Sequence, residues 1–147
     1  MAKFQLLPGF AAAIMIGGKP APEHEDTDEI QVDHEDPDVA EFQAARTLSK
    51  YIEAITGENF SIMFEVTAPL GHADMVYTKL IFEVYVDGIE AGKAFCGRPF
   101  FKNGGATWEH TMEGVTDGKG IKCTLKKFLF AKIETSISPL FPLILPS

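Results

Sequence analysis

The chain has 147 residues, a length typical of one domain, and its 46% hydrophobic and 23% charged residues are ordinary for a globular protein. The formal net charge of −8 argues against a nucleic-acid-binding surface, because such surfaces need an excess of Lys and Arg. The apolar segment at residues 139–146 is far shorter than the roughly 20 residues of a membrane-spanning helix, so no membrane role is expected.

The N-terminal region predicts a buried β-strand at residues 10–16, ended by Gly17-Gly18. The residues around this strand superficially resemble a secretory signal peptide. However, Gln5 and Pro8 interrupt the apolar stretch, and no small-residue cleavage pattern precedes the charged segment. The strand is therefore the preferred interpretation, and the protein is expected to be intracellular, in the cytoplasm or the nucleus.

An acidic stretch follows and accounts for the net charge. Residues 20–45 contain ten of the 21 acidic residues and no Lys or Arg, which leaves 11 acidic against 13 basic residues elsewhere. Like charges at this density oppose compaction, and few apolar residues are present to offset the entropy of the chain. The composition predicts a flexible acidic loop at about residues 20–45, with one short helical turn at residues 41–46.

The remaining chain alternates short β patterns with turn residues. Strands are expected from about residue 48 and at residues 60–66, 80–86, 93–96, 107–112 and 121–134, with a hairpin turn at Asp87-Gly88. About seven strands and at most one short helix predict a single antiparallel β-sandwich, jelly-roll or immunoglobulin-like, over residues 1–134. Residues 135–147 form an apolar, proline-rich tail that is expected to lie outside the fold.

Alternation along the predicted strands also gives a core. The side chains expected to be largely buried are Phe64, Phe82, Val84, Trp108 and Phe128, because each lies on the apolar face of its strand.

Several short motifs resemble one family. They are Pro8-Gly9-Phe10, Lys50-Tyr51-Ile52-Glu53-Ala54, Gly57-Glu58-Asn59-Phe60, Val86-Asp87-Gly88, the strand around Trp108, Gly118-Lys119-Gly120 and Leu125-Lys126-Lys127-Phe128. Over about residues 1–134 the chain is similar to an uncharacterised domain of unknown function found in filamentous fungi. The motifs consist of strand and turn residues, so the resemblance implies a fold but no activity, cofactor or catalytic residues.

The acidic stretch is the strongest candidate for a binding site. Its candidate binding residues are Glu23, Glu25, Asp26, Asp28, Glu29, Asp33, Glu35, Asp36 and Asp38. Carboxylates without counter-charges create a potential that attracts basic surfaces, so the expected partner is a basic protein. An intramolecular alternative is that the stretch faces the lysines near the last strand, at positions 119, 122, 126, 127 and 132.

Catalytic and metal-binding patterns are weak. His24 and His34 lie among carboxylates, but the stretch lacks the glycine and the fixed spacing of a calcium-binding loop. His72 with Asp74, and His110 beside Glu109, have no partnered nucleophile motif. No catalytic residue, metal or cofactor is therefore expected.

The leading hypothesis is a non-enzymatic β-sandwich that binds another protein through its acidic loop or its sheet surface. The alternative is a small secreted fungal effector or hydrolase with a cleaved N-terminus. That alternative requires a disulfide between Cys96 and Cys123, the two cysteines of the chain.

Overall fold

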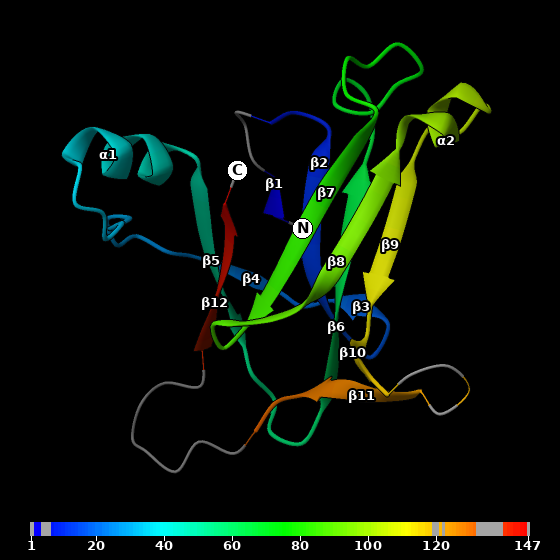
Figure 1. The fold of residues 1–147 in the computed structure, drawn as a ribbon. Helices are drawn as coiled ribbons and strands as arrows, with labels where there is room; N and C mark the ends of the chain where they lie inside the picture. The colour runs from blue at the N-terminus through cyan, green and yellow to red at the C-terminus, as the bar shows by residue number, and fades with distance from the viewer. Residues whose placement is uncertain (1, 4–6, 119–120, 122, 132–139, 147) are drawn as a thin grey trace.

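The fold of the protein was obtained as a computed structural model, which describes residues 2–3, 7–118, 121, 123–131 and 140–146. Over these residues the chain forms twelve β-strands and two short helices, and every strand pair is antiparallel (Figure 1). The expectation of a mainly β, antiparallel sandwich is confirmed, although the described residues form twelve strands instead of about seven and two helices instead of at most one.

The first layer is a sheet built around β6, which pairs with β2 along one edge and with β9 along the other. The last two residues of β11 pair with the start of β6. The strands of this sheet are β1 (Ala2–Lys3), β2 (Phe10–Ile16), β3 (Lys19–Pro20), β6 (Asn59–Val66), β9 (Trp108–Met112), β10 (Gly114–Asp117) and β11 (Thr124–Leu129). The alternation of Phe60, Ile62, Phe64 and Val66 predicted β6, because residues two apart in a strand lie on one face.

The second layer is a hairpin of β7 (Lys79–Val86) and β8 (Ile89–Gly97), which crosses in front of β2 and β6 in Figure 1. Asp87 and Gly88 have φ angles of 52° and 77°, as the tight turn between two twisted strands requires. The ring of Phe82 stacks on the ring of Phe64 at a centroid distance of 5.4 Å and so joins the two layers. The predicted hairpin is confirmed.

The predicted core is confirmed for three of its five residues. Phe64, Val84 and Phe128 are buried, whereas Phe82 and Trp108 pack against the core but keep part of their surface exposed. The reason is geometric, because a two-stranded layer leaves side chains near its edges only partly covered.

A third sheet has β5 (Thr47–Glu53) between β4 (Glu23–Glu25) and β12 (Leu140–Pro146). One expectation differs from this arrangement. The apolar tail was expected to lie outside the fold, but residues 140–146 pair with residues 47–53 along the full length of β5. Proline cannot donate a backbone hydrogen bond, yet an edge strand tolerates it, and β12 is such an edge.

The acidic stretch is also more structured than expected. It contributes β4 at its start and helix α1 (Pro37–Ala45) at its end, so a flexible loop over all of residues 20–45 is wrong. Helix α1 begins four residues before the predicted turn because Asp36 caps it and Pro37 occupies its first turn.

Three further differences concern the C-terminal half. A second helix, α2 (Arg98–Lys102), lies between β8 and β9, whereas at most one short helix was expected. The long strand expected at residues 121–134 is shorter, as β11 covers residues 124–129, and β10 covers residues 114–117, where no strand was expected. Residues 132–134 of that expected strand lie outside the described residues.

Candidate functional site

The acidic segment, defined here as residues 23–38, is attached to β5 at its N-terminal end. Glu25 and Lys50 lie opposite each other in the β4–β5 ladder and form an ion pair. The hydroxyl group of Ser49 donates a 2.6 Å hydrogen bond to Oδ2 of Asp26. The same hydrogen bond is the main reason that the pKa of Asp26 lies below the usual value for aspartate. Glu25 and Asp26 therefore stabilise the fold.

The C-terminal end of the acidic segment is held by α1. Oδ1 of Asp36 accepts a 2.9 Å hydrogen bond from the backbone N–H of Asp38, and Asp38 lies in the first turn of the helix. Negative side chains are favourable at this end of a helix because its free N–H groups carry partial positive charge. The ring of His34 adds a local contact, since its Nδ1 accepts a 3.0 Å hydrogen bond from the backbone N–H of Asp36.

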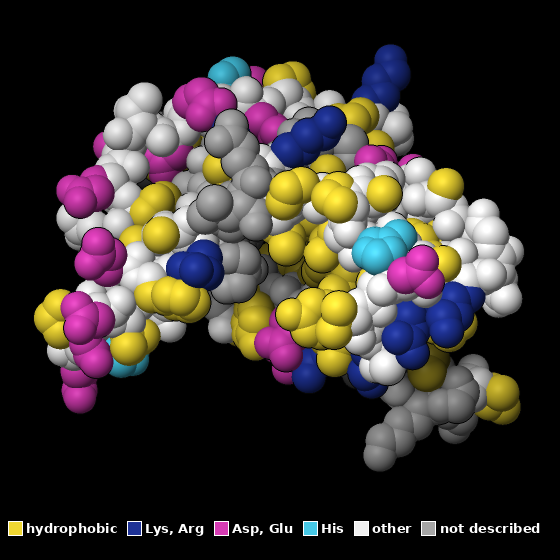
Figure 2. Space-filling model, turned by 90° about the horizontal axis from the view of Figure 1, so that it is seen from above, with side chains coloured by type: hydrophobic (Ala, Val, Ile, Leu, Met, Phe, Trp, Pro, Cys, Tyr) yellow, Lys and Arg dark blue, Asp and Glu magenta, His cyan; other side chains and the backbone are white. Residues whose placement is uncertain are grey.

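Four acidic side chains remain between these two attachments. Asp28, Glu29, Asp33 and Glu35 are all exposed. Glu23, by contrast, lies on β4 opposite Ile52 and is half-buried. Viewed from above, acidic side chains gather on the side of the molecule where α1 lies, and hydrophobic side chains gather near the middle (Figure 2). The nine candidate binding residues thus divide into those at the two attached ends of the segment and those exposed between these ends, a division that the sequence did not reveal.

The sequence also did not indicate which basic residue contacts the acidic segment. Sequence reasoning pointed to the lysines near the last strand, of which Lys126 and Lys127 lie on β11. Figure 1 shows β11 well apart from α1 and the segment before it, while Lys50 on β5 pairs with Glu25. Lys119, Lys122 and Lys132 lie outside the described residues. Opposite charges at paired positions of two neighbouring strands would predict this contact, but only the structure shows that β4 pairs with β5.

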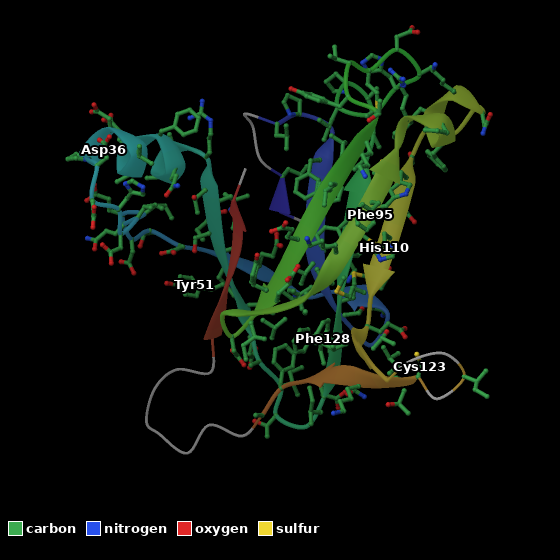
Figure 3. The ribbon with its side chains drawn as sticks, viewed as in Figure 1. Asp36, Tyr51, Phe95, His110, Cys123 and Phe128 are labelled. Atoms are coloured by element: carbon green, nitrogen blue, oxygen red, sulfur yellow. The ribbon has the colours of Figure 1, made fainter. Side chains whose placement is uncertain are left out.

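A groove of about 500 Å³ lies between β8 and the β9–β10 segment. Its lining includes Lys93, His110, Met112, Glu113, Val115 and Leu125. Gly92 of β8 faces Met112 of β9 across it, since a methyl group added to Gly92 would lie 3.2 Å from Cε of Met112. Figure 3 shows His110 on β9 near β8, where Phe95 is labelled. The groove joins segments about 20 residues apart in sequence, so no local motif could indicate it.

The histidines of the two candidate pairs make local contacts. The ring of His110 stacks on the ring of Trp108 two residues earlier, with centroids 5.8 Å apart and planes 8° apart. Nδ1 of His72 accepts a hydrogen bond from the backbone N–H of Asp74, which closes a local turn. Within the described ranges, no group of three or more His, Cys, Asp or Glu side chains could hold a metal ion. No helix in the described part of the chain is long and apolar enough to span a membrane.

The two cysteines are both free thiols in the structure. Cys96 lies on β8, opposite Leu80, and is fully buried between the layers, whereas Cys123 is exposed just before β11. Burial raises the pKa of the Cys96 thiol to about 11. The disulfide that the secreted alternative requires is therefore absent, because one sulfur faces the core and the other faces solvent.

Comparisons with known proteins complete the description of the site. No curated protein and no solved structure matches the chain. A family model described as a domain of unknown function, DUF7918, matches residues 9–140, which confirms the resemblance to an uncharacterised domain family. Because this match covers most of the 147 residues, the protein belongs to the DUF7918 family.

Proposed function

We propose that this domain is a protein-binding module, and that it holds a basic segment of a partner against the exposed part of its acidic segment. The single observation that supports the proposal is the placement of Asp28, Glu29, Asp33 and Glu35. They are exposed between two attached ends, in a segment without Lys or Arg. Such a group attracts cations and basic surfaces and speeds their association.

The attached ends favour binding for an entropic reason. A free acidic loop would lose its conformational freedom when a partner bound, and that loss would weaken the complex. Here Ser49 and Lys50 hold one end, and the Asp36 cap holds the other. The remaining loop is short, so less freedom is lost on binding.

The experiment uses a fluorescent lysine-rich peptide and measures its anisotropy as the full chain is added. The site variant changes four exposed acids and leaves the structural ones in place: Asp28→Asn, Glu29→Gln, Asp33→Asn and Glu35→Gln. The control variant changes four exposed acids elsewhere, which alters the net charge by the same amount: Glu53→Gln, Glu58→Gln, Glu109→Gln and Glu113→Gln. A nucleic-acid oligomer of similar length serves as a second probe.

The expected result is a loss of affinity of roughly tenfold or more for the site variant and a much smaller loss for the control. Binding to the peptide should weaken steeply as salt shortens the Debye length, and the nucleic acid should not bind. Equal losses in both variants would show that the net charge alone attracts the peptide, and the proposed site would then be wrong.

A further inference from the structure

The outer face of the β7–β8 hairpin carries three large, exposed apolar side chains among its charged residues. Its inner side chains, such as Val84 and Ala94, are buried against the first layer. On the outer face, Ile81 is 48% exposed, Tyr85 is 56% exposed and Phe95 is 55% exposed. Exposed apolar side chains that gather on one face commonly mark an interaction surface.

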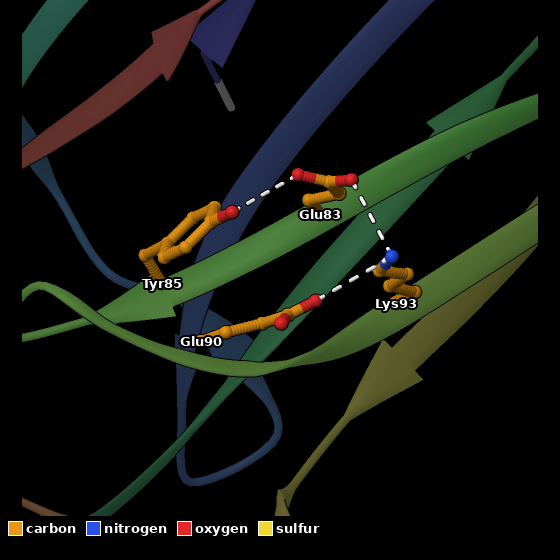
Figure 4. A network of polar contacts seen from close by, with 4 residues as sticks. All are labelled: Glu83, Tyr85, Glu90 and Lys93. Atoms are coloured by element: carbon orange, nitrogen blue, oxygen red, sulfur yellow. Dashed lines mark hydrogen bonds and ion pairs between the residues drawn. The ribbon is translucent and has the colours of Figure 1, made fainter.

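The charges of the same outer face balance each other. Glu83 lies opposite Lys93 in the ladder, and the Nζ atom of Lys93 is 3.6 Å from Oε1 of Glu83 and 3.7 Å from Oε1 of Glu90 (Figure 4). The hydroxyl group of Tyr85 donates a 3.0 Å hydrogen bond to Glu83. The ammonium group of Lys79 lies 5.6 Å from the centre of the Phe95 ring. Two lysines and two glutamates give this face no net charge, although the whole chain carries −8.

From this pattern we infer that the outer face of the hairpin binds a second copy of the chain, face to face, about a twofold axis that runs along the hairpin between β7 and β8.

The register of the hairpin supports this particular axis. A twofold rotation about a line between β7 and β8 places each residue of β7 over its own ladder partner in the other copy. Ile81 then meets Phe95 of the second copy, and Glu83 meets its Lys93, because these residues are partners in the ladder. A twofold axis across the strands at the level of this pair would instead place Glu83 over Glu83 and Lys93 over Lys93. Like charges brought together in this way are unfavourable, so the charge pattern selects the first arrangement.

The charge distribution also favours a second copy over other partners. A basic partner would be attracted to the acidic segment, where the negative charge is concentrated, and an acidic partner would find no excess of lysine on the hairpin. A neutral face with paired charges of both signs is self-complementary, as a twofold symmetric interface requires. Sheets packed face to face lie about 10 Å apart, which leaves room for side chains such as Ile81 and Phe95 to interlock.

The test measures the mass of the full chain by sedimentation and by light scattering, from low to high micromolar concentration. The variants are Glu83→Lys and Lys93→Glu, made separately. Each places like charges opposite one another in the proposed dimer, and both positions are exposed enough for the variant to fold, which circular dichroism checks. The two variants are also mixed in equal amounts. Glu53→Lys, at an exposed site outside the hairpin, is the control for the first charge change.

The expected result is a dimer for the unchanged chain and for the control, with dimerisation weakened roughly tenfold or more in each single variant. Mixing the two variants should restore the dimer as a heterodimer, because the lysine introduced in one copy then faces the glutamate introduced in the other. A chain that remains monomeric at all concentrations would overturn the proposal and leave the face to a different partner. Single variants that dimerise normally, or a mixture that stays monomeric, would show that the copies do not pair through this face.

Discussion

The ring of Phe82 in β7 stacks on the ring of Phe10 in β2, with centroids 4.9 Å apart and planes 13° apart. The centroid of the same ring lies 5.9 Å from the centroid of the Trp108 ring in β9. One side chain of the hairpin therefore contacts both β2 and β9, the strands on either side of β6. Stacked aromatic rings bury large apolar surfaces and add a favourable contact of their own. The two layers are therefore joined at Phe82.

The change Phe82→Ala tests this connection. Truncation of a buried Phe costs about 3–5 kcal/mol, and the partial exposure of Phe82 places the expected loss at about 3 kcal/mol of unfolding free energy. Urea unfolding at low protein concentration measures it. Phe95→Ala is the matched control, because Phe95 lies on the outer face of the same hairpin and should cost less than about 1 kcal/mol. Equal losses would mean that the layers do not depend on the inner face.

The change Asp36→Ala removes the cap of α1. Loss of an N-cap side chain costs about 1 kcal/mol, and here the backbone N–H of Asp38 also loses its acceptor. Urea unfolding should detect this loss, while Asp33→Ala, at an exposed acid of the same segment, should leave stability nearly unchanged. An equal effect of the two substitutions would show that general charge repulsion, rather than the cap, is measured.

Deletions separate the structured and exposed parts of the acidic segment. Replacing residues 28–35 by a short Gly/Ser linker keeps β4 and the Asp36 cap, so the melting temperature should change little. Replacing residues 23–38 removes β4 and the contacts of Glu25 and Asp26 with β5, and the melting temperature should fall by about 5 °C or more. Thermal unfolding followed by circular dichroism measures both. A large drop for the shorter deletion would show that the exposed acids also belong to the fold.

The stability contributed by Asp26 should depend on pH. Since its folded-state pKa is lowered, chiefly by the Ser49 hydroxyl group, the charged form stabilises the fold above the usual aspartate pKa of about 4. This contribution is lost as the pH falls through the folded-state pKa. The difference in melting temperature between the unchanged chain and Asp26→Asn should therefore be largest near neutral pH and shrink in acid. In a Ser49→Ala background the pH-dependent difference should be smaller, and an unchanged difference would exclude the Ser49 hydroxyl group as its cause.

The two thiols should react at very different rates. Cys123 is exposed, whereas Cys96 is buried with a pKa raised to about 11, so few Cys96 thiolates exist near neutral pH. A thiol reagent should label one cysteine per chain quickly in the native state and both in denaturant. Mass spectrometry of the labelled peptides identifies which cysteine reacts, and rapid labelling of Cys96 would contradict its place in the core.

Local patterns of the sequence determined the strands and turns whose side chains alternate clearly. The residues of β6 show period-two alternation, and Asp87-Gly88 favours the positive φ angles of a tight hairpin turn. The start of α1 at Asp36 and Pro37 was not predicted, because the density of like charges around these residues favoured a loop. The strand β6 and the hairpin turn depend on residues that are close together in the sequence, so the sequence alone is enough to predict them.

The tertiary structure alone decided which distant segments pair. The acidic Glu25 meets Lys50 because β4 lies beside β5, and the proline-containing tail becomes a strand because the other edge of β5 accepts it. Ile81 and Phe95 are apolar residues far apart in the sequence, and only the pairing of β7 with β8 and the packing of the two layers place them together on one exposed face of the hairpin. Strand pairing depends on the free energy of contacts between segments far apart in the chain. The local alternation of apolar and polar residues does not indicate that free energy.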